Sequence, residues 1–234
     1  MRRGVSRGLG AVIFDMDGVL IDSEPLHHRA TQAALGARGR SYTERDNRAF
    51  FGATDSEMLR VLRILFDLPQ STAELVAAKT ARLLELIRAE ARPLPGVPEV
   101  VRWLRESGLP LALATASRPP VIEAVLEAVG LAGAFAAVVS GDDVAHGKPA
   151  PDGFLLAARR LAVDPERCLV IEDSRNGVRA AKAAGMRVAA VPCDATSHED
   201  FSAADVVLPS LEALPKALPA LDGPGTRRAA AGGA

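Results

Sequence analysis

The sequence predicts an α/β protein, a doubly wound parallel sheet with a helical segment inserted after its first strand. Two observations favour this class. Over residues 93–221, short apolar runs alternate with helical patterns, which is typical of β-α-β units with helices on both faces of a sheet. Residues 23–92 show helical patterns without a strand. A helical block in that place is expected to lie as a cap over the carboxyl end of the sheet.

The first strand is predicted at residues 11–14, Ala-Val-Ile-Phe, directly before Asp15 and Asp17. Four apolar residues without alternation indicate a strand buried on both faces, and Gly18 indicates a sharp turn after it. Open α/β sheets bind ligands at the carboxyl ends of their strands. Two neighbouring carboxylates repel each other there and are costly to desolvate without a cation or a shared proton. The spacing therefore predicts a metal-assisted site for an anionic substrate.

The inserted segment is predicted to consist of helices. Pro25 suits the first turn of one helix, and Ser23 stands just before it as a candidate cap. Pro93 and Pro95 end the segment. The helical patterns cover residues 25–35, 55–66 and 72–88.

The rest of the sheet is predicted from apolar runs at residues 111–114, 137–139, 169–171, 188–191 and 206–208. Helical patterns alternate with these runs at residues 98–107, 120–129, 154–161 and 178–184. Three of these helices have a glycine just past their expected end, which is a common stop signal.

These patterns divide the chain into a core and a cap. The core, residues 9–22 with 93–221, has the alternation of a Rossmann-like doubly wound sheet. The cap is the α-helical segment of residues 23–92. Residues 1–8 and 222–234 are expected to be disordered tails, since the last dozen residues are rich in Gly and Ala.

Composition excludes several classes of protein. A formal net charge of −1 gives no electrostatic reason to expect nucleic acid or an anionic membrane as a partner. No apolar run approaches the roughly 18–20 residues of a membrane span, and residues 1–8 hold no apolar segment of signal-peptide length. Cys168 and Cys193 are too few for a disulfide scaffold, and we expect both to be small core hydrophobes in a reducing compartment. We expect a soluble cytoplasmic protein with no obligate protein partner.

Polar residues follow four of the predicted strands and would converge at one edge of the sheet. Each group has a simpler explanation when taken alone. The Asp-x-Asp-Gly stretch could form a turn, and Thr115 with Ser117 could cap the next helix. Lys148 could be a solvated loop lysine, and acids near a helix start are stabilised by its dipole. A shared edge nevertheless favours a functional site. The converging residues are Asp15, Asp17, Thr115, Ser117, Lys148, Glu172 and Asp173.

Four stretches of the chain carry these residues: Asp15-Met-Asp-Gly-Val-Leu-Ile-Asp-Ser-Glu24, Ala114-Thr-Ala-Ser117, Gly147-Lys-Pro-Ala-Pro-Asp152 and Val170-Ile-Glu-Asp-Ser-Arg-Asn-Gly177. In order and spacing they resemble the motifs of the haloacid dehalogenase superfamily of phosphotransferases. The resemblance covers about residues 11–211. It points to the branch that contains β-phosphoglucomutase, phosphoglycolate phosphatase and sugar-phosphate phosphatases. The helical insert matches the cap of that branch in position and size.

The resemblance implies a role for each of four core residues. Asp15 resembles the nucleophile, which attacks phosphorus and forms an aspartyl-phosphate. Asp17 resembles the general acid, which protonates the leaving oxygen and later draws a proton from water. Thr115 would donate a hydrogen bond to the transferring phosphoryl group, and Lys148 would neutralise its oxygens.

The resemblance also implies a Mg²⁺ site. Its ligands would be the Asp15 side chain, the Asp17 backbone carbonyl and Asp173. Glu172 would support the ion directly or through water. If Asp17 is protonated, the three remaining carboxylates balance the charges of Mg²⁺ and Lys148.

Substrate contacts are implied in both parts of the chain. In the cap, His27 either lies near the general acid or is a surface histidine, and Lys79 either reaches the substrate or is solvated. Gly52 lies either in a substrate-facing loop or in a simple turn, and His28 is expected to be solvated. The implied contacts are Gly18, Ala116 and Ser117 in the core and His27, Gly52 and Lys79 in the cap.

The resemblance favours a Mg²⁺-dependent phosphatase that hydrolyses a small phosphorylated metabolite, a sugar phosphate or a similar phosphomonoester. The alternative is a phosphomutase of the β-phosphoglucomutase type. Those enzymes carry a cap arginine for the distal phosphate, where this chain has Asp55, which would repel it. Arg48 or Arg60 could compensate.

Three other classes fit the residues less well. A non-catalytic phosphate sensor would tolerate loss of a core residue, yet all of them are present. A receiver-like domain would not contain the long helical insert. Dehalogenase chemistry needs neither Asp17 nor a metal ion, so sensitivity to EDTA would separate it from phosphoryl transfer.

Overall fold

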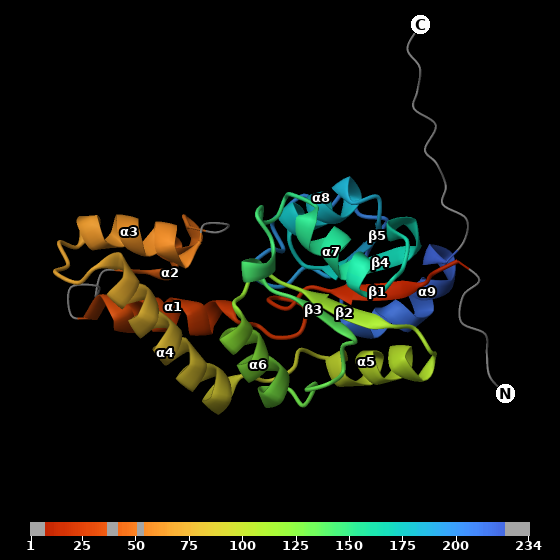
Figure 1. Cartoon of the computed structure of the whole chain (residues 1–234), viewed down its shortest axis with the longest axis horizontal. Helices are drawn as coiled ribbons and strands as arrows, with labels where there is room; N and C mark the ends of the chain where they lie inside the picture. Colours follow the sequence, from red (N-terminus) through yellow and green to blue (C-terminus); the bar gives the residue numbers. More distant parts are fainter. Residues whose placement is uncertain (1–7, 37–41, 51–53, 223–234) are drawn as a thin grey trace, which may run out of the picture.

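A six-stranded parallel sheet forms the core, with strands β1 (Ala11–Phe14), β2 (Leu111–Ala114), β3 (Ala137–Val139), β4 (Cys168–Glu172), β5 (Arg187–Ala190) and β6 (Val206–Val207). The computed structural model describes residues 8–36, 42–50 and 54–222. The spatial order is β3-β2-β1-β4-β5-β6 (Figure 1). Ile13 of β1 is in register with Ala112 on one side and Val170 on the other. The chain leaves β1 toward β2 and returns on the opposite side with β4, so ligand binding is expected where β1 and β4 end.

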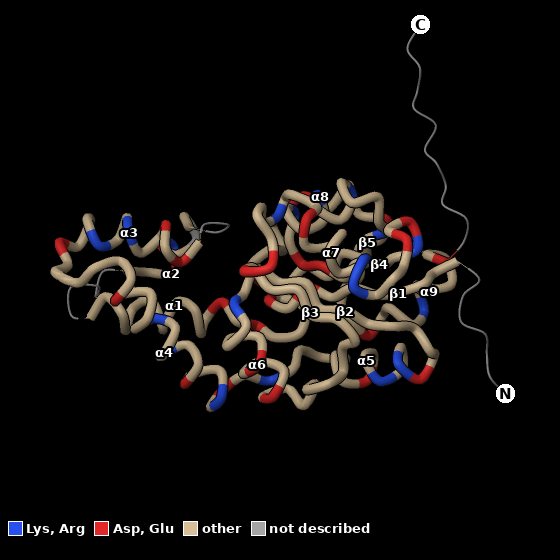
Figure 2. The backbone as a smooth tube through the Cα atoms, in the orientation of Figure 1, with Lys and Arg blue, Asp and Glu red and all other residues tan. Residues whose placement is uncertain are grey.

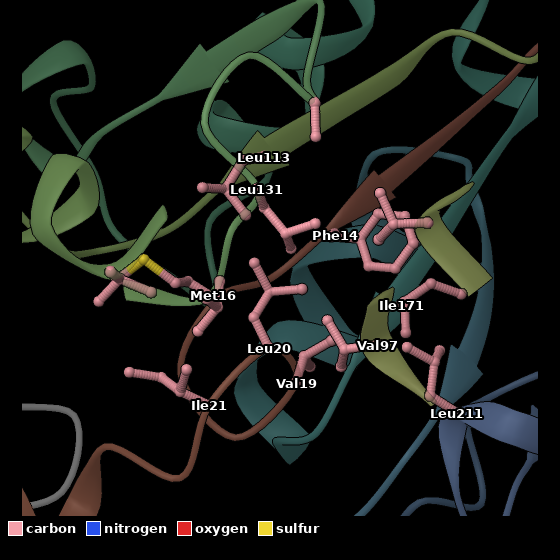
Figure 3. Close-up of a cluster of buried hydrophobic side chains, with 14 of the residues drawn as sticks. Phe14, Met16, Val19, Leu20, Ile21, Val97, Leu113, Leu131, Ile171 and Leu211 are labelled. Atoms are coloured by element: carbon pink, nitrogen blue, oxygen red, sulfur yellow. The ribbon is translucent and has the colours of Figure 1, made fainter. Parts of the chain in front are cut away.

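Five helices cover the two faces of the sheet: α5 (Val97–Glu106), α6 (Pro119–Ala128) and α9 (Leu214–Leu221) on one, and α7 (Asp152–Arg160) and α8 (Arg175–Ala183) on the other. Successive strand residues point to opposite faces. Phe14 therefore packs with the first group of helices and Ile13 with the second. Figure 3 shows Phe14 and Ile171 gathered with Leu20 from the loop after β1. Burial on both faces explains why β1 is uniformly apolar.

Among the residues that the structure describes, four helices follow β1 before the chain reaches α5: α1 (Glu24–Leu35), α2 (Glu44–Arg48), α3 (Asp55–Leu65) and α4 (Thr72–Glu90). They lie beyond one end of the sheet (Figure 1). Leu59, Leu62 and Tyr42 belong to a hydrophobic cluster of their own. Ala30 of α1 and Ile87 of α4 belong instead to the cluster on the first face of the sheet, so the inserted helices also pack on the core.

The predicted fold class is confirmed, and the predicted elements differ from the observed ones by a few residues at their ends. Two helices have no signal in the sequence patterns. Helix α2 has no apolar repeat, and reciprocal hydrogen bonds between Thr43 and Asp46 hold its start. Helix α9 contains Pro219 in its interior, which argues against a helix, yet it buries three leucines. Ser23 is buried before α1, but its side chain makes no capping hydrogen bond, contrary to expectation.

Asp222 is hydrogen-bonded to the start of the core, although composition assigns it to the C-terminal tail. Its Oδ1 accepts hydrogen bonds from the backbone N–H groups of Gly8 and Leu9, at 3.1 and 2.8 Å. Residues 1–7 and 223–234 lie outside the described residues.

Acidic and basic residues are interspersed along both the inserted helices and the core (Figure 2). Within the described ranges, no helix is long and apolar enough to cross a membrane.

Candidate active site

Asp15 stands at the carboxyl end of β1, next to the end of β4. Its backbone N–H donates to the carbonyl of Ile171 at 3.0 Å, which continues the pairing of the two strands by one residue. The chain then turns back at Gly18, whose φ is +76°. A Cβ at Gly18 would stand 2.1 Å from Oδ2 of Asp173. Only glycine allows both this backbone conformation and this close approach of the loop to the end of β4.

Lys148 joins the ends of β1 and β4. Its ammonium lies 2.7 Å from Oδ1 of Asp15 and also donates to Oε1 of Glu172. Oε2 of Glu172 accepts hydrogen bonds from the backbone and hydroxyl of Ser174, at 2.7 and 2.9 Å. Glu172 is fully buried, so these contacts replace the water that its carboxylate loses. The ammonium also lies over the ring of Phe154, 5.1 Å from its centre.

Asp15, Glu172 and Asp173 form a buried acidic cluster in which one carboxylate oxygen of each lies within 4.8 Å of the others. Burial raises the pKa of Asp15 well above its usual value, and Lys148 only partly offsets this. Burial, together with the charge of Glu172, raises the pKa of Asp173 to about 7. The pKa of Lys148 is raised, because Asp15 and Glu172 outweigh the opposing effect of burial.

The chemistry of this cluster fits a divalent cation. The one ammonium, that of Lys148, pairs with Asp15 and Glu172, so when all three carboxylates are ionised the cluster carries a net charge of −2. All the candidate ligand atoms are oxygens, which hard cations prefer. The carboxylates of Asp15, Glu172 and Asp173 could therefore hold one divalent ion here.

In the absence of a divalent cation, we expect the melting temperature to fall as the pH rises from about 4 to about 7. An acid whose pKa is raised by folding binds its proton more tightly in the folded state, so it stabilises the fold at low pH. That stabilisation is lost as the pH passes from 3.8, the ordinary pKa of Asp173, to about 7, its folded value. Thermal melts in EDTA, with and without added Mg²⁺, measure this effect. Mg²⁺ should raise the melting temperature more at about pH 8 than at about pH 5.

Asp173→Asn is the control for that experiment, since it removes the group that titrates in this window. The variant should show a shallower fall with pH in EDTA and a smaller response to Mg²⁺. A wild-type protein that melts higher in EDTA at about pH 8 than at about pH 5 would contradict the expectation.

Two residues that the sequence patterns do not single out contact Asp173. The thiol of Cys193 donates to Oδ2 of Asp173 at 3.2 Å, and the hydroxyl of Thr196 donates to the same oxygen at 3.3 Å. Cys193 is therefore not a core hydrophobe as expected, whereas Cys168 is fully buried in the core. Cys193 and Thr196 both lie in the loop after β5, which opens at the same edge of the sheet as the other site residues. Their position after a predicted strand is the one feature of the sequence that could have identified them.

Asp17 has no ion pair in the described structure and contacts hydroxyl groups instead. Ser117 donates to its Oδ2 at 3.0 Å, and Thr115 approaches the same oxygen at 3.4 Å. The other oxygen, Oδ1, is buried without a hydrogen-bond partner among the described residues. Thr115 also accepts the backbone N–H of Ser117 at 3.0 Å, which fixes the loop after β2. Ala116 is exposed between them.

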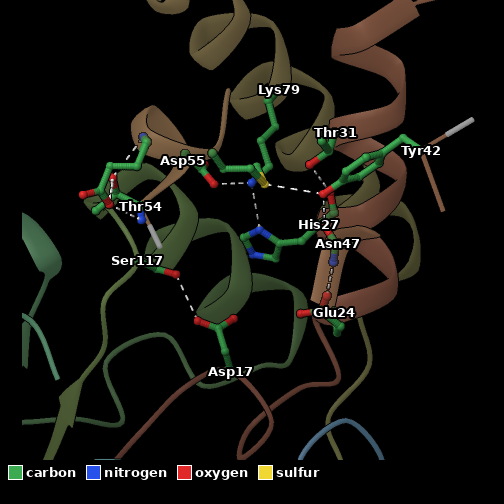
Figure 4. Close-up of polar contacts among 12 residues, drawn as sticks. Asp17, Glu24, His27, Thr31, Tyr42, Asn47, Thr54, Asp55, Lys79 and Ser117 are labelled. Atoms are coloured by element: carbon green, nitrogen blue, oxygen red, sulfur yellow. Dashed lines mark hydrogen bonds and ion pairs between the residues drawn. The ribbon is translucent and has the colours of Figure 1, made fainter. Parts of the chain in front are cut away.

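In the inserted helices, Lys79 forms a salt bridge with Asp55 and lies 3.4 Å from Nδ1 of His27 (Figure 4). Lys79 is buried, so the expectation of a solvated lysine is wrong. Asp55 is not a lone acid, since it is the counter-ion of Lys79. His27 is half-buried, and burial followed by the Lys79 charge lowers its pKa. Gly52 lies outside the described residues.

A second polar network in these helices has no signal in the sequence patterns. The hydroxyl of Tyr42 donates to Oδ1 of Asn47 at 2.7 Å, and the Asn47 amide donates to Glu24. Burial, then the charge of Glu24, raises the pKa of Tyr42. His28 packs its ring on Tyr42 with centroids 5.6 Å apart, so it is not a freely solvated residue as expected.

Comparison with known proteins places these observations in a family. Residues 9–185 match the family model described as haloacid dehalogenase-like hydrolase. Fructose-1-phosphate phosphatase YqaB of Escherichia coli K12 is 39% identical over 178 residues, which are 75% of this chain and 92% of that protein. Hexitol phosphatase B of the same strain is 39% identical over 218 residues, which are 89% of this chain and 95% of that protein.

A solved structure agrees in fold. A mutant of CbbY from Rhodobacter sphaeroides in complex with xylulose-(1,5)bisphosphate superposes with a TM-score of 0.80 and 34% identity, over 88% of this chain and 96% of that one. The sheet order, the helical insertion after β1 and the family match over residues 9–185 agree with one another. This chain belongs to the haloacid dehalogenase-like hydrolase family.

Proposed function

We propose that this protein is a Mg²⁺-dependent phosphatase that hydrolyses a phosphorylated sugar or sugar alcohol through an aspartyl-phosphate intermediate. The observation that carries the proposal is the pair of unlike carboxylates after β1. Asp15 is paired with the ammonium of Lys148, whereas the hydrogen-bond partners of the Asp17 side chain among the described residues are hydroxyl groups. Phosphoryl transfer to an aspartate needs one carboxylate that attacks and another that handles protons. The two E. coli relatives are named for phosphatase activity on fructose 1-phosphate and hexitol phosphates.

In the first step, a carboxylate oxygen of Asp15 attacks phosphorus while the bond from phosphorus to the ester oxygen breaks. Asp17 gives its proton to the leaving oxygen. The buried Oδ1 of Asp17, which lacks a partner among the described residues, is the oxygen available for that transfer. Lys148 neutralises charge that gathers on the phosphoryl oxygens, and Thr115 donates to them.

In the second step, water attacks the phosphorus of the aspartyl-phosphate and gives a proton to Asp17. The bond between phosphorus and Asp15 breaks, which restores the Asp15 carboxylate and releases inorganic phosphate. Asp17 is protonated again and ready for the next substrate. Ser117, which donates to Oδ2 of Asp17, keeps this carboxyl group in place through both steps.

A divalent ion would be held by the side chains of Asp15 and Asp173 and the backbone carbonyl of Asp17, with Glu172 in support. We propose Mg²⁺, because an all-oxygen donor set suits a hard cation that keeps several water ligands. When bound, the ion supplies positive charge to the phosphate group. Cys193 and Thr196 orient Asp173 for this role.

We propose that residues 23–92 act as a cap domain over a core of residues 9–22 and 93–221. Closure of the cap would exclude bulk water and choose the leaving group. Gly18, Ala116 and Ser117 would face the substrate from the core. His27 would face it from the cap.

Phosphorus-31 NMR of the purified protein with Mg²⁺ and a panel of phosphorylated metabolites tests the proposal. We expect inorganic phosphate to appear from one or a few sugar or polyol phosphates and to be blocked by EDTA. Asp15→Asn should release none, because the amide cannot form the aspartyl-phosphate. A new ester that grows without free phosphate, from β-glucose 1-phosphate with trace 1,6-bisphosphate, would instead establish a mutase. Activity that survives Asp15→Asn would refute the proposed nucleophile.

A further inference from the structure

Cys193, Thr196 and Asp173 bring one sulfur and two oxygen atoms together beside the acidic cluster. The thiol of Cys193 lies 3.2 Å from Oδ2 of Asp173 and 3.4 Å from the hydroxyl oxygen of Thr196. That hydroxyl oxygen lies 3.3 Å from the same carboxylate oxygen. The three atoms therefore form a nearly equilateral triangle. Orienting Asp173 needs only hydrogen-bond donors, which a hydroxyl supplies as well as a thiol, so the proposed reaction gives the sulfur no use of its own.

The triangle has the dimensions of one face of a metal coordination shell. Metal–sulfur bonds of about 2.3 Å and metal–oxygen bonds of about 2.0–2.2 Å, meeting at about 90–110°, place the two ligand atoms about 3.1–3.6 Å apart. The separation of 3.2 Å between the Cys193 sulfur and the Asp173 oxygen lies within that range. Asp173 and Thr196 are buried, whereas Cys193 is half-buried, so a small ion can reach the sulfur from solvent.

Asp173 is shared between this triangle and the acidic cluster. Its carboxylate groups with those of Asp15 and Glu172, and the thiol of Cys193 is not a member of that group among the described residues. An ion that takes the sulfur as a ligand therefore lies away from Asp15. Two divalent ions on one buried carboxylate repel each other strongly. Occupation of the sulfur position therefore weakens binding at the acidic cluster, and the reverse.

The softness of the ligand atoms separates the ions that would take the two positions. Mg²⁺ is a hard cation that binds oxygen, so it favours the carboxylates of the acidic cluster. A thiolate instead selects softer cations such as Zn²⁺. When such an ion binds Cys193, the metal–sulfur bond forms as the S–H bond breaks, and the proton passes to water.

We propose that Cys193 determines the metal specificity of this site, because it provides a second ion position that a thiophilic divalent cation takes at the expense of Mg²⁺. The ligands of that position are the sulfur of Cys193 and the carboxylate of Asp173, with the hydroxyl of Thr196 beside them. One consequence rests on the proposed phosphatase function: Zn²⁺ inhibits the Mg²⁺-dependent reaction, because it draws Asp173 away from the ion beside Asp15.

Cd²⁺ is the probe for the sulfur position, because it is thiophilic and its bond to a thiolate absorbs in the ultraviolet, unlike its bond to a carboxylate. The protein, freed of metal with EDTA and desalted, should gain a charge-transfer band on titration with Cd²⁺. Cys193→Ser should lose that band. Its half-inhibition by Zn²⁺ in the presence of Mg²⁺ should need at least about tenfold more Zn²⁺ than the wild type does. Serine still donates a hydrogen bond to Asp173, so a purely orienting cysteine predicts no such change.

Cys168→Ala is the matched control. Cys168 is the other of the two cysteines of the chain, and it is fully buried in the core. This variant should keep the band, with a Cd²⁺ affinity within about twofold of wild type. Melting curves show whether both variants fold. In the wild-type protein, Cd²⁺ but not Mg²⁺ should protect Cys193 from alkylation by iodoacetamide, and peptide mapping reads this protection without any variant.

Addition of Mg²⁺ tests whether the two positions share Asp173. Saturating Mg²⁺ should raise the Cd²⁺ concentration that gives half of the band by about tenfold or more, since two coupled sites weaken each other equally. Asp173→Asn should weaken binding of both ions. A band that does not respond to Mg²⁺ would mean that the two positions are independent, which contradicts the inference.

Three further results would overturn the inference: no band and no protection of Cys193 in the wild-type protein, a band that persists in Cys193→Ser, or equal inhibition of wild type and Cys193→Ser by Zn²⁺. If the protein releases no phosphate from any ester, the proposed phosphatase function fails. The Cd²⁺ titration and the alkylation need no substrate, so they still decide whether Cys193 binds a thiophilic ion.

Discussion

Lys148→Met should lower the rate of phosphate release by about 100- to 1,000-fold or more, the usual scale for loss of a group that stabilises developing charge. The ammonium of Lys148 is the described cation that contacts both Asp15 and Glu172. Methionine keeps the length of the aliphatic stem but removes the charge. Asp15 would then face the substrate phosphate with Glu172 and Asp173 as uncompensated neighbours, which repels the substrate and weakens the nucleophile.

Stability should fall together with activity. Breaking a buried ion pair by removing one partner costs about 3–5 kcal/mol, because the remaining charges stay buried without a partner. Phosphate-release assays and thermal melts measure the two effects. Lys182→Met is the matched control, since Lys182 pairs with Asp205 at 2.8 Å on the surface, where such a pair contributes at most about 1 kcal/mol. A Lys148→Met protein that keeps more than about a tenth of wild-type turnover would show that this ammonium is not required.

Gly177→Ala should inactivate the protein and destabilise it by about 3 kcal/mol or more. A Cβ at Gly177 would stand 1.7 Å from Oε1 of Glu172 and 1.9 Å from its Cδ. Gly177 lies in the first turn of α8, so the backbone cannot move away without disturbing that helix. The methyl group must displace the Glu172 carboxylate, which would lose its contacts with Lys148 and Ser174 inside the core.

Gly153→Ala separates this effect from the general cost of a side chain in a helix. Gly153 lies in the first turn of α7, and an added Cβ there meets nothing within 4 Å. That substitution should be neutral or stabilise by up to about 1 kcal/mol. In a Glu172→Ala background, Gly177→Ala should lose most of its cost, because the three nearest atoms all belong to Glu172. Melts of the four proteins in this cycle measure the coupling, and additive costs would refute the clash.

Much of this site follows from the sequence because parallel strands share one edge. The apolar run before Asp15, and the similar runs before Thr115 and Glu172, predict three neighbouring strands. Their carboxyl ends must then lie together, whatever the details of packing. The same patterns could not predict the contacts of Cys193 and Thr196 with Asp173. These two residues lie in an irregular loop, where no periodicity relates sequence position to direction.

The inserted helices were less predictable than the sheet for the same reason. Their apolar repeats predict the helices but not which polar side chains meet between them. Helix α2 has no such repeat and follows from the cap of Thr43 rather than from burial. Tyr42 and Asn47 are close in sequence, yet their hydrogen bond and its link to Glu24 depend on how α1 and α2 pack.

By itself the sequence determined a parallel sheet with a helical insertion after the first strand, because strand and helix patterns are local. It also determined that Asp15, Asp17 and Lys148 share one edge, because the carboxyl ends of parallel strands always lie at the same edge of a sheet. Only the tertiary structure decided which charges are paired. From the sequence, Lys79 could have been solvated and Asp55 a lone acid, but the packing of α3 against α4 buries one beside the other. The charge that a substrate meets depends on burial and on distances across helices, and these quantities exist only once the chain has folded.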